Sequence, residues 1–116
     1  MMRRGEIRIV DLELIRGAEA SKTRPAVIVS NDGANSTATR LGRGVVTVIP
    51  VTSNVERIYP FQVLLTAAAT GLQRDSKAQA EQVRSVAVER IGKRVAVVSP
   101  SVMALLDEAL RLHLSL

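Results

Sequence analysis

The sequence predicts a small, mainly β protein: an antiparallel β-barrel followed by one C-terminal α-helix. Short runs rich in β-branched residues recur along the 116 residues, and turn-forming residues separate them. An apolar pattern with helical spacing follows residue 99. Because many short strands leave exposed sheet edges, a closed or half-closed barrel is the natural arrangement for them.

Six segments are expected to form the strands: residues 5–11, 23–30, 45–52, 61–66, 78–88 and 94–98. In the first, Ile7 and Ile9 share one face of an alternating pattern, which is typical of a half-buried strand. In the second, Pro25 presets the backbone and removes one donor, which suits the first residue of a strand. In the third, Pro50 predicts a sheet edge or a bulge near the end of the strand.

The connections differ in length and composition. Residues 12–22 form a loop longer than an ordinary hairpin connection, and loops of this size often carry function. Residues 31–35 are rich in Asn, Asp and Gly and indicate a turn cluster or a short helical turn. Residues 67–77 are expected to form a further loop around Gly71.

The C-terminal helix is predicted to begin at Ser99-Pro100-Ser101, because serine caps free N–H groups and proline fits the first helical position. Its apolar face is expected to consist of Val102, Leu105, Leu106, Ala109, Leu110 and His113. His113 is the single histidine, so it has no second histidine for an acid–base pair. A packed or interface position is expected for it.

Composition indicates a single domain over residues 1–116, with 47% hydrophobic residues to form its core. Cysteine is absent, which excludes disulfides and thiolate metal sites and favours a reducing compartment. Neither a secretory signal nor an apolar run long enough to span a bilayer is visible in the sequence. A soluble cytoplasmic protein is therefore expected.

The positive net charge of the chain is compatible with binding to polyanions but does not by itself determine the function. The net charge is +5, and a basic balance attracts nucleic acids through their phosphates. A genome that prefers arginine codons would explain the same balance equally well. The carboxylates show no metal-ligand spacing with histidine, and no phosphate-binding loop or dinucleotide fingerprint occurs. Neither a metal nor another cofactor is expected.

A candidate site arises where two expected strands end. Arg24 begins one strand, and Thr52 and Ser53 end another. If these strands pair antiparallel, their opposite termini meet at one rim of the barrel. A guanidinium and a hydroxyl at that rim could bind one phosphate. The alternative is structural: Arg24 bonded to loop carbonyls and Thr52 capping a turn.

Several short motifs resemble one known family along nearly the whole chain. They are Arg4-Gly5-Glu6-Ile7, Asp11-Leu12, Gly17-x-Glu19, Lys22-x-Arg24-Pro25-Ala26-Val27-x-Val29-Ser30, Pro50-x-Thr52-Ser53, Tyr59-Pro60-Phe61 and Gln82-Val83-Arg84-Ser85. In order and spacing they resemble the MazF/PemK toxins of bacterial toxin–antitoxin pairs, the actinobacterial members in particular. The resemblance implies an SH3-like barrel assembled as a homodimer. It also implies a partner antitoxin with an acidic disordered tail.

The same resemblance implies a metal-independent endoribonuclease that cuts single-stranded RNA, with messenger RNA as the expected class. In the family, the ribose 2′-OH attacks the adjacent phosphate and leaves a 2′,3′-cyclic phosphate and a 5′-OH. The catalytic residues implied here are Arg24, Thr52 and Glu19. The substrate-binding residues implied here are Ser53, Gln82, Lys22 and Arg84.

This chemistry suits the residue types. Charge develops on the phosphorane oxygens, and a fixed guanidinium and a hydroxyl would stabilise it. Arg24 is a poor proton acceptor, so its expected roles are charge stabilisation and proton donation to the leaving oxygen. Glu19 is the candidate base. A surface salt bridge of Glu19 with Lys22 or Arg16 is an equally good interpretation.

The chain departs from the family pattern at three positions. Arg8 stands where the family usually has an aromatic residue, Leu14 where it often has proline, and Ala18 where it often has serine. These changes affect the expected base specificity more than the cleavage step. Two other functions remain open: a non-enzymatic toxin that binds DNA gyrase through the C-terminal helix, and a plain RNA-binding barrel.

Overall fold

A computed structural model describes residues 2–12 and 23–116. The elements, in chain order, are β1 (Glu6–Asp11), β2 (Thr23–Ile28), α1 (Asp32–Leu41), β3 (Val45–Thr52), β4 (Gln62–Leu65), α2 (Ala67–Thr70), β5 (Ser76–Gln79), the 3-10 turn η1 (Ala80–Gln82), β6 (Arg84–Ala87), the 3-10 turn η2 (Val88–Arg90), β7 (Ile91–Val97) and α3 (Pro100–Leu114). No helix in the described part of the chain is long and apolar enough to cross a membrane.

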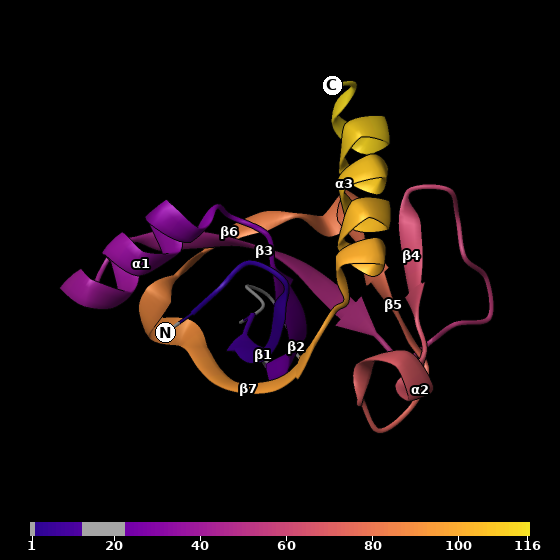
Figure 1. Cartoon of the computed structure of the whole chain (residues 1–116), viewed down its shortest axis with the longest axis horizontal. Coiled ribbons are helices and arrows are strands. Elements are labelled where there is room, and N and C mark those ends of the chain that lie inside the picture. Colours follow the sequence, from indigo (N-terminus) through magenta and orange to yellow (C-terminus); the bar gives the residue numbers. More distant parts are fainter. Residues whose placement is uncertain (1, 13–22) are drawn as a thin grey trace, which may run out of the picture.

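The strands form one antiparallel sheet in the order β4-β5-β3-β2-β1-β7, and β6 pairs with β3. β7 curves round β1 and β2, while α3 stands beside β4 and β5 (Figure 1). The predicted class, mainly β with a C-terminal helix, is confirmed. Between described residues no pairing closes the sheet, which therefore has the shape of an open, SH3-like barrel with β4 and β7 at its ends.

The long strand β3 joins the two halves of this sheet. One edge of β3 pairs with β2, while the other edge pairs first with β6, up to Val48, and then with β5, from Val51. Pro50 lies opposite Ala26 of β2, between the two partners of the other edge. The missing N–H of Pro50 therefore lies in the gap between β6 and β5, where no described strand pairs with that edge of β3. The interruption of pairing that Pro50 predicts thus occurs inside the sheet.

Two helices replace expected turns. Asn31 accepts a hydrogen bond from the backbone N of Ala34 (2.8 Å) and starts a ten-residue helix, α1, that ends at Gly42 in the left-handed conformation (φ 69°). The predicted turn at residues 31–35 is thus only the first part of a helix, since Asn is a strong N-cap as well as a turn residue. The expected loop at 67–77 contains the short helix α2 and the start of β5.

The expected strand at residues 78–88 is wrong as a single element. Its first residues belong to β5, the turn η1 follows, and β6 then pairs with a different part of β3. Similarly, β7 starts at Ile91, three residues before the expected start of the last strand. Both β5 and β6 run antiparallel to β3, so η1 inserts extra residues between them without reversing the chain, which explains why the sequence pattern looks continuous.

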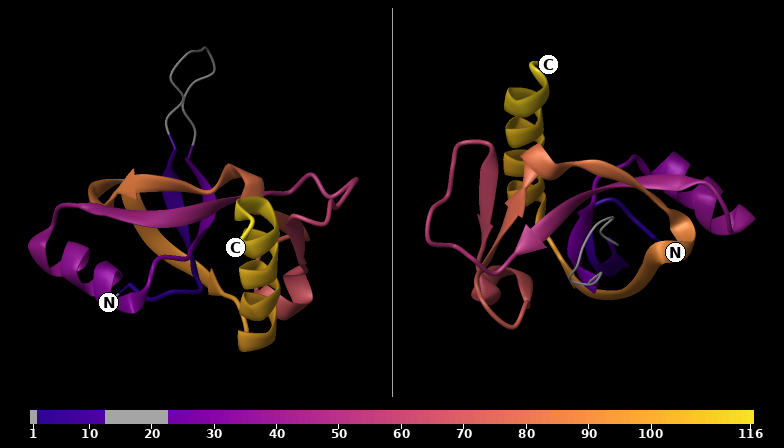
Figure 2. Two further views of the ribbon diagram at one scale, coloured as in Figure 1. Left: turned by 90° about the horizontal axis from the view of Figure 1, so that it is seen from above. Right: turned by 180° about the vertical axis from the view of Figure 1, so that it is seen from behind.

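Apolar side chains fill both faces of the sheet. In β2, Val27 faces a core cluster that includes Leu106 of α3, while Ala26 and Ile28 face a second cluster that includes Ala38 of α1. Because side chains alternate between the two faces of the sheet, a single strand contributes residues to both core clusters. Figure 2 shows α1 at one end of the molecule and α2 with β4 and β5 at the other.

Helix α3 buries a narrower face than expected. Leu106 and Ala109 are buried, and Val102 and Leu110 are half-buried. By contrast, Leu105 is 56% exposed and His113 is exposed. The helix contacts the sheet on one side only, so the residues at the edges of its apolar stripe remain outside the core.

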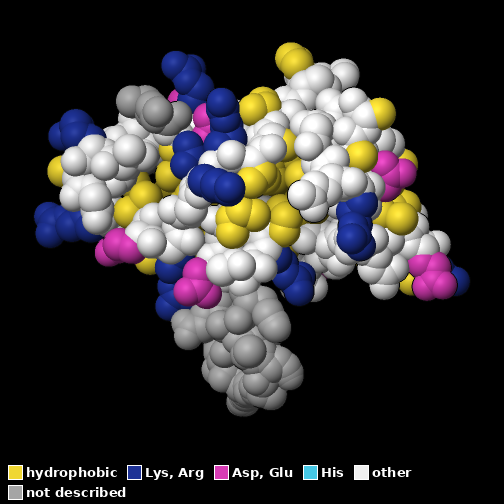
Figure 3. Space-filling model, turned by 90° about the horizontal axis from the view of Figure 1, so that it is seen from below, with side chains coloured by type: hydrophobic (Ala, Val, Ile, Leu, Met, Phe, Trp, Pro, Cys, Tyr) yellow, Lys and Arg dark blue, Asp and Glu magenta, His cyan; other side chains and the backbone are white. Residues whose placement is uncertain are grey.

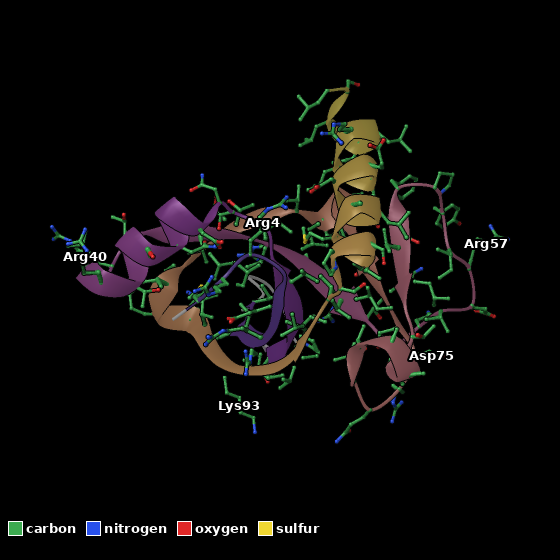
Figure 4. The ribbon with its side chains drawn as sticks, in the orientation of Figure 1. Arg4, Arg40, Arg57, Asp75 and Lys93 are labelled. Atoms are coloured by element: carbon green, nitrogen blue, oxygen red, sulfur yellow. The ribbon has the colours of Figure 1, made fainter. Side chains whose placement is uncertain are left out.

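Arg4 joins three elements near the start of the chain. Its backbone N donates to Asp32 Oδ1 of α1 (2.7 Å), its Nε donates to the carbonyl of Val29 after β2 (2.8 Å), and its Nη2 contacts Asp107 Oδ1 of α3 (2.6 Å). Figure 4 shows Arg4 between α1 and α3. Arg4 thus ties both helices to the end of a core strand.

Candidate functional site

A groove of about 930 Å³ lies where β2 begins and β3 ends. Arg24, Thr52 and Ser53 all line it, so the structure brings together the three residues that were expected to share one rim. The other described residues that line it are Ile9, Thr23, Pro25, Val51, Gly71, Leu72, Gln73, Arg74, Ser76, Lys93, Arg94 and Val95.

The register of β2 and β3 explains why Arg24 and Thr52 meet. Ala26 pairs with Pro50 and Val27 with Ile49, so the same antiparallel register extended by two residues sets Arg24 opposite Thr52. Thr52 itself turns to pair with Lys77 of β5. Both residues therefore belong to paired strands, Arg24 opposite Val10 of β1 and Thr52 opposite Lys77 of β5, and this pairing fixes their backbone positions.

Each side chain remains available to a ligand. Arg24 is exposed and makes no hydrogen bond or ion pair with any described residue. Thr52 is half-buried, and its Oγ1 accepts a hydrogen bond from the backbone N of Asn54 (3.2 Å). Thr52 does cap a turn, then, but as an acceptor, which leaves its hydroxyl proton free to be donated into the groove.

Two predicted RNA contacts lie elsewhere. Arg84 belongs to β6 and pairs with Val48, and its Nη1 is 3.4 Å from the carbonyl oxygen of Leu12. Gln82 is exposed in η1. Neither residue lines the groove of Arg24. The predicted residues Glu19 and Lys22 lie outside the described residues, as do the departures Leu14 and Ala18.

The third departure, Arg8, is part of an ion-pair cluster. Its Nε and Nη2 contact Glu6 Oε1 at 3.0 and 2.9 Å, and its Nη1 donates to the carbonyl of Gly92 (3.0 Å). Glu6 Oε2 also lies 3.7 Å from Arg94 Nη1. Arg8 therefore links β1 to β7, which is a structural role on the edge strand of the sheet.

Three cations of the groove were missed by sequence reasoning. Arg74 comes from the connection between α2 and β5, and Lys93 and Arg94 come from β7. With Arg24 they form a set that we call the groove cations. None of the described residues that line the groove is a carboxylate. The pair Lys93-Arg94 after Gly92 is visible in the sequence, but only the path of β7 places it beside Arg24.

The surface around this end of the molecule is mixed. Seen from below, Lys and Arg side chains surround exposed apolar side chains (Figure 3). Within residues 2–12 and 23–116, no group of three or more His, Asp or Glu side chains is placed to hold a metal ion. The chemical resources of the groove are therefore guanidinium, ammonium and hydroxyl groups, which are donors suited to phosphate oxygens.

A second, smaller hollow of about 510 Å³ lies between β4 and α3. Its character is apolar, and its lining includes Leu64, Leu105 and Leu112, which are 45%, 56% and 56% exposed. It carries one carboxylate, that of Glu108. This hollow offers surface for association rather than groups for chemistry.

Comparison with known proteins identifies the family. A family model described as "PemK-like, MazF-like toxin of type II toxin-antitoxin system" matches residues 3–114. The chain is 66% identical over 116 residues to endoribonuclease MazF9 of Mycobacterium tuberculosis, covering all of this chain and 98% of that protein. It is 30% identical to endoribonuclease MazF of Staphylococcus epidermidis, covering all of this chain and 93% of the other.

Solved structures agree with the fold. An endoribonuclease from a mycobacterial species, in complex with its cognate antitoxin, superposes with a TM-score of 0.78 at 22% identity and covers all of this chain and 97% of the other. The chain belongs to the family of PemK-like and MazF-like toxins of type II toxin–antitoxin systems.

Proposed function

We propose that the chain is the endoribonuclease toxin of a type II toxin–antitoxin system and that the Arg24–Thr52 groove is its cleavage site for single-stranded RNA. The observation that carries the site is the convergence of Arg24, Thr52 and Ser53 on one groove whose described lining has four cations and no carboxylate. The activity is supported by the relatives, which are named endoribonucleases and match the whole chain.

The reaction we propose is an internal transfer at one phosphate. The ribose 2′ oxygen attacks the adjacent phosphorus, a P–O bond forms there, and the bond to the 5′ oxygen of the next nucleotide breaks. The 2′ proton passes to the carboxylate of Glu19, and the leaving 5′ oxygen takes up a proton from Arg24. The products are a 2′,3′-cyclic phosphate and a 5′-OH, so no water and no metal ion enters this step.

The groove residues have distinct roles in this step. Arg24 stabilises the charge that grows on the phosphorane oxygens, since its guanidinium is free of other ion pairs with described residues. Thr52 donates its hydroxyl proton to the same oxygens, because its lone pair already accepts from Asn54. Ser53 supplies a neighbouring hydroxyl. Glu19, which precedes Arg24 by five residues in the sequence, is the proposed base.

Further RNA contacts extend from the groove. Lys22 precedes β2, while Gln82 and Arg84 lie on the other side of β3 and outside the groove. In this proposal they contact nucleotides that flank the cleaved bond. Their loss should change affinity or base preference and leave the rate of the bound complex unchanged.

Cleavage of a long RNA by the purified chain tests the activity. The expected result is a set of cuts at one short sequence, each with a free 5′-OH and a cyclic phosphate, in the presence of EDTA. Cuts that require a divalent ion would contradict the proposed chemistry. RNA binding without products would instead favour a plain binding barrel, and gyrase poisoning without products would favour the non-enzymatic toxin.

The partners follow from the family and from the charge of the groove. A cationic groove that binds RNA should also bind an acidic disordered antitoxin segment, which would block the site by occupying it. A synthetic acidic peptide should therefore compete with RNA for the groove.

A homodimer is proposed from the resemblance, and the exposed leucines of α3 and β4 supply apolar surface for it. Light scattering, which gives the mass of the particle in solution, tests the dimer. The proposed site of action is the cytoplasm, where messenger RNA is available.

A further inference from the structure

Strand β7 runs irregularly where it lines the groove. Between Ile7 and Arg8, β7 advances two residues for one in β1, and between Arg8 and Val10 it advances three residues for two. A regular strand sends successive side chains to opposite faces. Here Lys93, Arg94 and Val95 all line the same groove. Two bulges, one on each side of Arg94, account for this, because a bulge re-aims the side chains next to it.

Gly92 permits the bulge that lies opposite Arg8 to Val10. A Cβ at this position would lie 2.9 Å from the backbone oxygen of Ile9, closer than real Cβ atoms approach. Its own carbonyl accepts a hydrogen bond from Arg8 Nη1 at 3.0 Å. The backbone of β7 is thus pressed against β1 and fixed there, directly before Lys93. Because the backbone at Gly92 is held in place, the direction in which the next residue, Lys93, projects is also restricted.

The cations that line the groove beside Arg24 differ in whether a carboxylate neutralises them. Arg94 lies 3.7 Å from the buried carboxylate of Glu6, which Arg8 also contacts. Lys93 and Arg74 make no ion pair with any described residue. In Figure 4, Lys93 projects from β7 away from the ribbon. Uncompensated cations on different elements beside one groove are the arrangement expected for a polyanionic ligand.

We propose that Lys93 and Arg74, with Arg94 beside them, form a second phosphate subsite that holds a nucleotide flanking the cleaved bond. The subsite rests on the proposed cleavage site at Arg24. β1 lies between β2 and β7, so the backbone of Lys93 is two strand spacings, about 10 Å, from that of Arg24. That separation suits a neighbouring phosphate of an extended strand rather than the phosphate bound by Arg24. The subsite therefore positions RNA and takes no part in the chemical step.

Steady-state cleavage of a fluorescent RNA that contains the mapped cut sequence tests this subsite. Lys93→Ala should raise KM about tenfold at low salt and leave kcat within about twofold, because it removes a phosphate contact made equally in ground and transition states. Arg74→Ala should act in the same direction. Lys93→Arg should restore KM. The matched control is Arg40→Ala, which removes one exposed cation from α1 at the far end of the molecule (Figure 4).

Binding of the same RNA with a 2′-deoxy nucleotide at the cut position gives an independent measurement. The slope of log K against log salt should fall by about 0.7 for Lys93→Ala, the value for one phosphate contact on a single strand. Equal slopes for Lys93→Ala and wild type, or an equal change in Arg40→Ala, would overturn the subsite. If the wild-type chain does not cleave RNA, the proposed function is refuted. The salt dependence of RNA binding would still test whether Lys93 contacts a phosphate.

Truncated RNAs separate the two phosphates. Removing nucleotides from one end of the substrate should abolish the difference in KM between wild type and Lys93→Ala. The end at which this happens shows on which side of the cleaved bond the subsite lies. A Lys93 effect that persists in both truncation series, down to a single phosphate, would overturn the proposal. It would place Lys93 on the cleaved phosphate itself.

Discussion

Two groups of cationic side chains in this chain differ in whether other residues of the fold pair with them. Arg4 and Arg8, which we call the anchor arginines, are bonded to carboxylates and backbone carbonyls of several elements. Among the groove cations, Arg24, Arg74 and Lys93 make no ion pair with described residues. The first group therefore stabilises the fold, while the second leaves its charge available to an anionic ligand.

The contrast also shows in position. Arg4 lies two residues before β1 and Arg8 lies within it, and they join this part of the chain to α3 and β7. The groove cations lie at the entrance of β2, before β5 and inside an irregular part of β7. Positive charge as such predicts neither role. What separates the roles is whether the guanidinium also donates to a backbone carbonyl of another segment, as Arg4 does to Val29 and Arg8 to Gly92.

Arg24→Ala gives the largest expected effect and tests the contrast most strongly. We expect kcat to fall about a thousandfold, because a guanidinium aimed at developing charge is lost. The free energy of unfolding should stay within about 0.5 kcal/mol of wild type, since the side chain is exposed. Cleavage assays and thermal unfolding check both. A strong loss of stability with normal kcat would move Arg24 to the anchor group.

Thr52→Val is expected to lower kcat about a hundredfold, because it removes one hydroxyl donor while keeping the shape of the side chain. Thr52→Ser is the matched control and should retain most of the activity. Single-turnover cleavage measures the chemical step directly. If valine and serine variants cleave equally well, the Thr52 hydroxyl has no part in the reaction.

Arg4→Ala should affect stability instead of activity. It removes the contacts with Val29 and Asp107, and the ion pair is about one-third exposed (32% and 34%). We expect the free energy of unfolding to fall by about 1–2 kcal/mol, after allowing for solvent screening of the pair. Urea denaturation gives this value. A loss of kcat at a temperature where the variant is folded would contradict the assignment.

Arg111→Ala has the smallest expected effect. Its pair with Glu108 is 2.9 Å long but lies on the surface, with 56% and 71% of the two side chains exposed. Such pairs contribute little, so the free energy of unfolding should change by less than about 0.5 kcal/mol. The same urea titration applies. A larger loss would mean that charge pairing alone, rather than attachment to other elements, defines the anchor group.

The sequence predicts the parts of the fold in which local pattern and tertiary structure agree. The alternation at Ile7 and Ile9 and the β-branched run before Thr52 correspond to β1 and β3, and Ser99 caps α3 as expected. Helix α1 was missed because Asn31 serves equally well as a turn residue or an N-cap. The choice between them is made by Ala38, which packs in the core.

For the candidate site, prediction reaches Arg24, Thr52 and Ser53 because strand ends in an antiparallel pair must meet. It does not extend to Arg74 or Lys93, since Arg74 depends on the path of the connection from α2 to β5 and Lys93 on two bulges in β7. A bulge leaves no fixed pattern in a sequence. Gln82 and Arg84 show the converse, because after β5 the chain continues along β3 toward Val45, away from Thr52 and the groove.

The irregular register of β7 has a consequence for how relatives of this toxin can diverge. A slip of one residue turns every following side chain of a strand to its other face. Deleting one codon between Gly92 and Val95 would therefore exchange the side chains that face the groove while barely altering the composition of the strand. With the proposed phosphate subsite on β7, gain and loss of single codons there would change RNA preference and leave Arg24 and Thr52 untouched.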